Sequence, residues 1–141
     1  MAQSRKQTRI QSVWAVSDLE KLIAAIDKGS PMGKRDYAII LLACRLGVSV
    51  SDIKKLMFVN FHWENNELVF IQSKTRNILS LPITQDVGWA VIEYLKCGRH
   101  KVESSYVFIR YLALFLPFSE DDHLSQMITK YMRLEHIPVS I

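Results

Sequence analysis

Residues 34–56 constrain the fold of this chain most, because a helix that is apolar nearly all round ends there at an abrupt stop. Between Lys34 and Leu46 the apolar side chains fall on every side of a helix; they include Ile39, Ile40, Leu41, Leu42 and Cys44. A helix of that kind is buried on most of its sides. Gly47 then supplies a C-terminal stop. Ser51 can cap a third, short helix to about Met57, with Asp52 at its positive end.

Further helices are expected on either side of this central one. Ser17 and Glu20 form a capping box with Val16 as the staple residue, which predicts a first helix to about Lys28. Thr84 caps a fourth helix that ends near Gly98. One face of that helix is apolar, through Val87, Ala90, Val91, Tyr94 and Leu95. Residues 99–122 are expected to be irregular, and a last helix is predicted over about His123–Leu134.

Three short extended runs lie between the third and fourth helices. Phe58–His62 and Leu68–Gln72 flank a tight-turn sequence at residues 64–66, and Ile78–Leu81 follows a polar turn at residues 73–77. Pro82 closes the last run. The sequence therefore predicts an α+β fold, mainly helical, with a small three-stranded antiparallel sheet whose tip carries basic residues.

Length and charge set outer bounds on organisation and partners. The 141 residues are enough for one domain with a real core. Hydrophobic residues make up 49% and charged residues 23%, a globular composition. The net charge of +4 leans toward polyanionic partners. Residues 1–15 are basic and aperiodic, so we expect an arm or linker there and a single domain over residues 16–141.

Several classes of protein receive no support from the sequence. Cys44 and Cys97 lie in apolar helical patterns without a C-x-x-C, as in reduced core cysteines of a cytoplasmic protein. No signal peptide is visible, and the longest apolar segment, Tyr106–Phe118, is broken by Arg110 and too short for a membrane span. No metal-ligand spacing or glycine-rich phosphate loop occurs. We therefore expect no cofactor, no small-molecule substrate and no membrane association.

The order of three elements resembles the opening of the tyrosine recombinase (phage integrase) catalytic domain. These elements are the segment from Gly47 to Ile53, a lysine on the following hairpin turn, and the helix VGWAVIEYLK. The resemblance runs from about Trp14 to Ile137. It implies a partial catalytic-domain fold, double-stranded DNA as partner, and DNA cleavage and rejoining as the family's reaction. It also implies that Lys74 matches the family's hairpin lysine, which enters the minor groove and protonates the leaving 5′ oxygen. A solvated turn residue is the alternative for Lys74.

The sequence departs from the family at the catalytic residues. Ser49 stands where the family places its first arginine, which grips the scissile phosphate through paired hydrogen bonds. Loss of such a contact costs roughly 3–4 kcal/mol of transition-state stabilisation. The alternative for Ser49 is a polar residue before a helix. No histidine or carboxylate pair is spaced to make Ser49 a nucleophile.

The family's later catalytic elements are also missing from the expected places. No histidine is followed by arginine at the third position, and no tyrosine lies where the family's nucleophile would. Lys130 and Arg133 fit that spacing formally, but we interpret them as a solvated helix face. We therefore expect a truncated domain, about the first half to two-thirds, that is catalytically inactive alone.

Basic residues elsewhere predict a phosphate footprint for DNA. It comprises Arg5, Lys6 and Arg9 in the arm, Lys54 and Lys55 on the third helix, and Lys74 and Arg76 on the turn. Arg99 and Lys101 are interpreted as solvated surface. The alternative function is a protein-interaction module or a decayed remnant, which would form homo-oligomers through exposed apolar faces such as Tyr106–Phe118.

Overall fold

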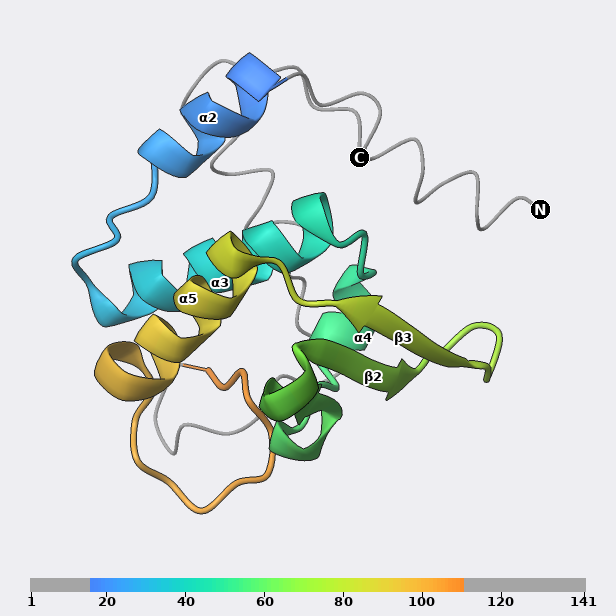
Figure 1. Cartoon of the computed structure of the whole chain (residues 1–141). Helices are drawn as coiled ribbons and strands as arrows, with labels where there is room; N and C mark the ends of the chain where they lie inside the picture. Colours follow the sequence, from blue (N-terminus) through green and yellow to red (C-terminus); the bar gives the residue numbers. More distant parts are fainter. Residues whose placement is uncertain (1–15, 111–141) are drawn as a thin grey trace.

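Helix α3 (Pro31–Arg45) is the centre of the computed structural model, which describes residues 16–110 (Figure 1). It begins three residues before the predicted Lys34, because Ser30 caps it: the Ser30 Oγ accepts a hydrogen bond from Gly33 N at 3.0 Å. Pro31 occupies the first turn, where its missing N–H costs nothing. Gly33 fits inside this turn because a Cβ there would lie 1.7 Å from the carbonyl oxygen of Asp27. The Gly29–Gly33 segment is therefore only partly a loop.

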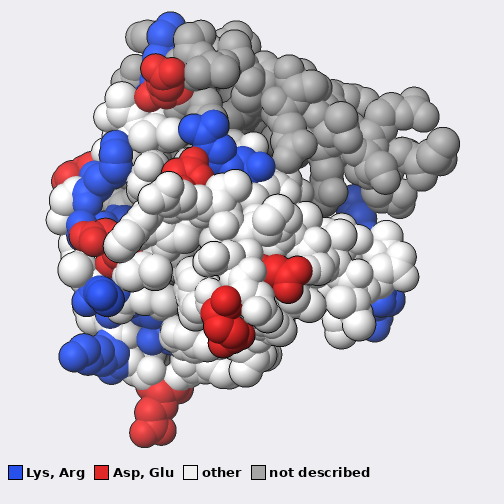
Figure 2. Space-filling model, in the orientation of Figure 1, with Lys and Arg blue, Asp and Glu red and all other residues white. Residues whose placement is uncertain are grey.

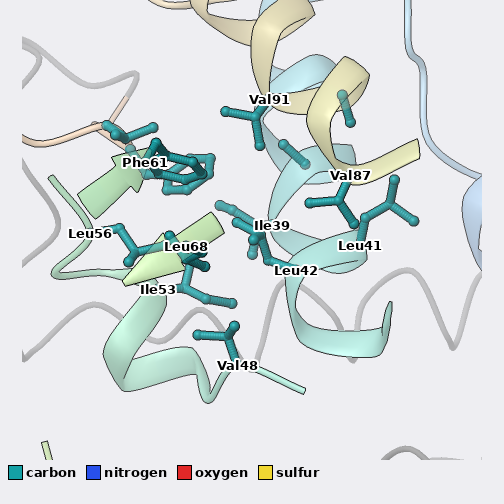
Figure 3. Close-up of a cluster of buried hydrophobic side chains, with 14 of the residues drawn as sticks. Ile39, Leu41, Leu42, Val48, Ile53, Leu56, Phe61, Leu68, Val87 and Val91 are labelled. Carbon is teal, nitrogen blue, oxygen red and sulfur yellow. The ribbon is translucent and has the colours of Figure 1, made fainter. Parts of the chain in front are cut away.

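The prediction that α3 is buried on most sides is confirmed. Its fully or nearly fully buried apolar residues are Ala38, Ile39, Ile40, Leu41, Leu42 and Ala43. Figure 3 shows the side chains of α3 meeting those of helix α5 on one side and those of the sheet on the other. Gly47 ends this region as predicted, with a left-handed φ of 73° that a side chain would oppose.

Helix α2 (Val16–Ala24) packs on α3 through a smaller cluster of Leu22, Ile26 and Ile40. Ser17 lies inside this helix, so its predicted role as the cap is wrong. The helix also ends before the predicted Lys28, because the N–H groups of residues 25 and 26 bond to carbonyls three residues back and tighten the last turn.

The sheet is three-stranded and antiparallel in the order β1-β2-β3, as predicted. Its strands are β1 (Phe61–His62), β2 (Glu67–Ile71) and β3 (Ile78–Pro82). The first strand is shorter than predicted because residues 58–60 form a 3₁₀ turn, η1 (Phe58–Asn60). The Asn60 side chain replaces strand pairing there: it accepts from Met57 N at 2.7 Å and donates to Val69 O at 2.9 Å. A second 3₁₀ turn, η2 (Trp63–Asn65), leads into β2.

Helix α5 (Gln85–Glu93) follows Thr84 and continues into a π-helical turn, η3 (Tyr94–Gly98). Thr84 is the N-cap residue as predicted, but its hydroxyl donates to Asp86 Oδ1 instead of capping a backbone N–H. Burial alone would raise the pKa of Asp86. The hydrogen bonds from Thr84 and Val87 N, with the charge of Arg45, outweigh it and hold that pKa below its usual range.

Residues 107–109 close the core from a segment without helix or regular strand. Tyr106 bridges to Met57, and Val107, Phe108 and Ile109 are fully buried. The irregular segment was predicted, whereas Tyr106–Phe118 was predicted to offer a free apolar face. That prediction is wrong for residues 107–109, because they pack inside the domain. The last predicted helix, His123–Leu134, lies outside the described residues.

The two cysteines differ from one another. Cys44 is half-buried on α3, and burial raises the pKa of its thiol to about 12 against the opposing charge of Arg45. Cys97 is exposed, which corrects its prediction as a core residue. Between residues 16 and 110 no helix combines the length and apolar character of a membrane span.

Candidate nucleic-acid interface

Ser49 caps helix α4 (Val50–Ile53). Its Oγ accepts a hydrogen bond from Asp52 N at 3.3 Å and donates to Asp52 Oδ2 at 2.9 Å. The helix therefore begins before the position predicted from Ser51, and the cap assignment to Ser51 is wrong. A third contact, to Ser51 Oγ at 3.3 Å, is also local, so the hydroxyl is engaged within its own turn.

Asp52 connects this helix to the turn between β2 and β3. Its side chain is buried, and Oδ1 accepts from Ser73 N at 2.9 Å and from Ser73 Oγ at 2.7 Å. We call this set of bonds the Asp52–Ser73 latch. A buried carboxylate needs such donors to offset its loss of hydration. From the sequence, Asp52 was expected only to act at the helix terminus; no sequence signal pairs it with a serine 21 residues later.

The turn beyond Ser73 is held by its own hydrogen bonds. Gln72 N donates to Asn77 O and Arg76 N donates to Gln72 O, both at 2.9 Å. Arg76 has a left-handed φ of 62°, a conformation uncommon for any residue other than glycine and asparagine. Lys74, Thr75 and Arg76 are all exposed. A hydrogen-bonded turn thus presents two cationic side chains to solvent.

Three of the sequence-predicted cations gather at this end of the molecule. Lys55 Nζ lies 3.3 Å from Ser73 Oγ, which places it beside the turn that carries Lys74 and Arg76, whereas Lys54 is half-buried. We call Lys55, Lys74 and Arg76 the basic tip. Figure 2 shows Lys and Arg side chains at the right-hand edge of the view, where Figure 1 places the β2–β3 turn. Glu67, the acidic residue of the hairpin, pairs with Pro82 at its opposite end.

Three other predicted contacts, Arg5, Lys6 and Arg9, lie outside the described residues, as do Lys130 and Arg133. Arg99 was interpreted as solvated surface, and this is wrong. Its guanidinium and Nε donate to four backbone carbonyls, those of His100, Ser104, Tyr106 and Val107, at 2.8–3.3 Å. Arg99 therefore holds the loop that returns to the core, while Lys101 is exposed as expected.

Known proteins resemble this chain both in sequence and in fold. The model of the phage integrase family matches residues 13–134. This chain belongs to the phage integrase family. A protein of Sinorhizobium fredii (strain NBRC 101917 / NGR234) named integrase/recombinase y4gC is 30% identical over 112 residues, 79% of this chain and 57% of that protein. Another from the same strain, named integrase/recombinase y4rA, is 31% identical over 82% of this chain and 28% of its own length.

A solved structure agrees with the fold. The crystal structure of XerA recombinase matches with a TM-score of 0.70 at 17% identity, over 90% of this chain and 44% of that one. The predicted α+β, mainly helical architecture with a small antiparallel sheet is thereby confirmed as that of part of a phage integrase catalytic domain. The chain spans about half the length, or less, of the family members it matches.

Proposed function

We propose that this member of the phage integrase family binds duplex DNA through the basic tip and does not cut DNA by itself. The observation that carries the proposal is that Lys55 lies beside the exposed, hydrogen-bonded turn that presents Lys74 and Arg76. Lysine and arginine contacts to phosphate supply the sequence-independent part of DNA affinity. The strained backbone of Arg76 adds support, because such residues cluster at functional sites.

The hydrogen bonds of Ser49 support the proposal that this chain does not cut DNA by itself. Its hydroxyl is neutral, short and already engaged with Asp52. Three arginines between residues 16 and 110 are already engaged elsewhere: Arg35 is buried against Asp36, Arg45 pairs with Asp86, and Arg99 binds backbone carbonyls. An absent phosphate clamp costs roughly 3–4 kcal/mol in the transition state. A covalent protein–DNA adduct trapped on a nicked suicide substrate would contradict this part.

Fluorescence anisotropy of labelled duplex DNA over a range of salt concentrations tests DNA binding. The slope of log K against log salt is negative, and each lost phosphate contact reduces its magnitude by about 0.9. Lys74→Ala/Arg76→Ala should therefore reduce the magnitude of the slope by about 1.8. Lys96→Ala/Lys101→Ala removes the same charge from exposed sites away from the turn and should leave the slope near that of the wild type. Binding without any salt dependence would overturn the proposal.

We also propose that residues 1–15 form a basic arm that contacts DNA next to a domain over residues 16–141. An arm that contacts DNA adds Arg5, Lys6 and Arg9 to the footprint. The variant Arg5→Ala/Lys6→Ala/Arg9→Ala should then lower the salt slope by up to about 2.7. An unchanged slope would remove the arm from the footprint and leave the basic tip in it.

A second candidate function is a protein-interaction module that self-associates. Trp89 on α5 favours it, because this large apolar side chain is 64% exposed. It borders two hollows of about 390 and 420 Å³, one shared with Tyr37 and the other with Trp63. Sedimentation velocity would detect concentration-dependent dimers that Trp89→Ala abolishes. A wild type that stays monomeric would exclude this candidate.

A further inference from the structure

Two isoleucines stand exposed beside the basic tip. Ile71 ends β2 and Ile78 begins β3, and they lie opposite one another in the last register pair before the turn. Their exposed fractions are 63% and 72%, whereas Leu68 and Phe70, on the other face of β2, are buried. Fully burying an isoleucine side chain contributes roughly 1.5–3 kcal/mol, which this pair does not gain within the described domain.

The position of the pair points to the kind of surface that would cover it. Ile71 is three residues before Lys74, and Ile78 is two residues after Arg76. At about 3.3 Å per residue, apolar and cationic groups fall within about 10 Å of each other. A DNA strand advances about 3.4 Å per nucleotide, so such a patch covers about three nucleotides. The DNA backbone presents charged phosphates and apolar deoxyribose faces at this spacing.

Charge decides between DNA and a second copy of this chain as the occupant. Two copies meeting through this face would bring two basic tips together, and like charges in contact oppose association. A polyanion reverses the sign of that interaction. Proteins that enter the minor groove also insert apolar side chains, isoleucine among them, between base steps there.

We propose that Ile71 and Ile78 form an apolar contact with the deoxyribose face of the DNA that the basic tip holds. This inference rests on the proposed DNA binding and deepens it. The cations bind phosphate and release counterions, while the isoleucines lose water against the sugars. The two contributions therefore respond differently to salt.

The test is a comparison of affinity and salt slope in Ile71→Thr/Ile78→Thr. Threonine keeps the β-branch and the strand preference of isoleucine but removes apolar surface. We expect duplex affinity to fall about tenfold at every salt concentration, with the wild-type slope retained. Val59→Thr is the matched control: Val59 is 74% exposed but lies in η1, outside the hairpin, and its variant should bind as the wild type does.

The outcomes separate the inference from the function on which it rests. Wild-type affinity in the double variant, while Lys74→Ala/Arg76→Ala still lowers the slope, would overturn the isoleucine contact and leave DNA binding in place. No salt-dependent binding by the wild type would overturn both. A wild-type dimer that the double variant converts to monomer would assign the pair to a protein interface instead. If the double variant does not fold, Ile78→Thr alone should lose about threefold in affinity, and no loss would overturn the inference.

Discussion

Two regions of this molecule each contain a residue with a left-handed backbone, but they use their polar side chains differently. Gly47 has φ of 73° and opens the segment that holds Ser49 and Asp52, whereas Arg76 has φ of 62° on the β2–β3 turn. In the first region glycine satisfies the backbone at little cost, and the polar side chains bond to one another. In the second an arginine occupies a conformation that glycine would adopt more easily, and the side chains point to solvent.

The polar groups of segment 47–53 are used within the fold: the Ser49 hydroxyl caps a helix, and the Asp52 carboxylate forms the Asp52–Ser73 latch. The turn 73–77 instead keeps exposed charge at a conformational cost, as our proposal of a DNA-binding turn leads us to expect.

Asp52→Ala should destabilise the domain by about 3 kcal/mol. The substitution leaves Ser73 N and the hydroxyls of Ser73 and Ser49 without their acceptor, and hydrogen bonds to a charged group contribute roughly 1.5–3 kcal/mol each. Urea denaturation measures the change. Ser73→Ala removes only one of these bonds and should cost about 1 kcal/mol. A small effect in both variants would mean that the latch does not join the two regions.

Gly47→Ala should cost about 1–2 kcal/mol, because an L side chain opposes the left-handed conformation. Thermal and urea unfolding both report the loss. Gly47→Asn is the matched variant: asparagine tolerates this conformation better, so part of the stability should return. Equal stability of the alanine variant and the wild type would remove the backbone basis of the comparison.

Ser49→Ala should cost about 1 kcal/mol, the usual contribution of an N-cap side chain. Ser51 is exposed and does not cap the helix, and its hydroxyl only contacts Ser49 Oγ at 3.3 Å, so Ser51→Ala should change stability by less than about 0.5 kcal/mol. Unfolding in urea distinguishes the two. If the Ser51 variant were the less stable, the cap assignment to Ser49 would be wrong.

Arg76→Gly should have the opposite sign, a gain of about 0.5–1 kcal/mol, since relief of the left-handed strain exceeds the added freedom of glycine in the unfolded chain. The same substitution should lower the DNA salt slope by about 0.9. Calorimetry and anisotropy on one preparation give both values. A variant that is more stable and binds DNA with an unchanged slope would show that the arginine has no role in binding.

Much of the fold follows from short-range patterns in the sequence. The apolar residues on every side of residues 39–44 predicted the central helix, Gly47 predicted its end, and the turn sequences at residues 64–66 and 73–77 predicted β2 and β3. Helix termini were less predictable: Ser30-Pro31 and Ser49 capped helices that the sequence began at Lys34 and Ser51. At α4 two nearby serines, Ser49 and Ser51, could each supply the cap, and at α3 the Ser30-Pro31 start was interpreted as a loop; helix ends are uncertain by a residue or two from sequence alone.

The candidate site divides in the same way. The order of the motif and the turn predicted that Lys55, Lys74 and Arg76 belong to one surface. The Asp52–Ser73 latch and the carbonyl contacts of Arg99 could not be predicted, because each joins residues whose proximity is set by the return of the chain. The exposure of Ile71 and Ile78 could not be predicted either, since the apolar run in β2 does not say which face of the strand is covered.

The closure of the core by residues 107–109 has a consequence for biosynthesis. While the ribosome releases this chain, α3 emerges long before the segment that fills its remaining apolar side. Until Val107, Phe108 and Ile109 have left the exit tunnel, part of the apolar surface of α3 is exposed to water or bound by a chaperone. The nascent domain is therefore at its most aggregation-prone in the interval between the completion of α5 and the arrival of that tripeptide.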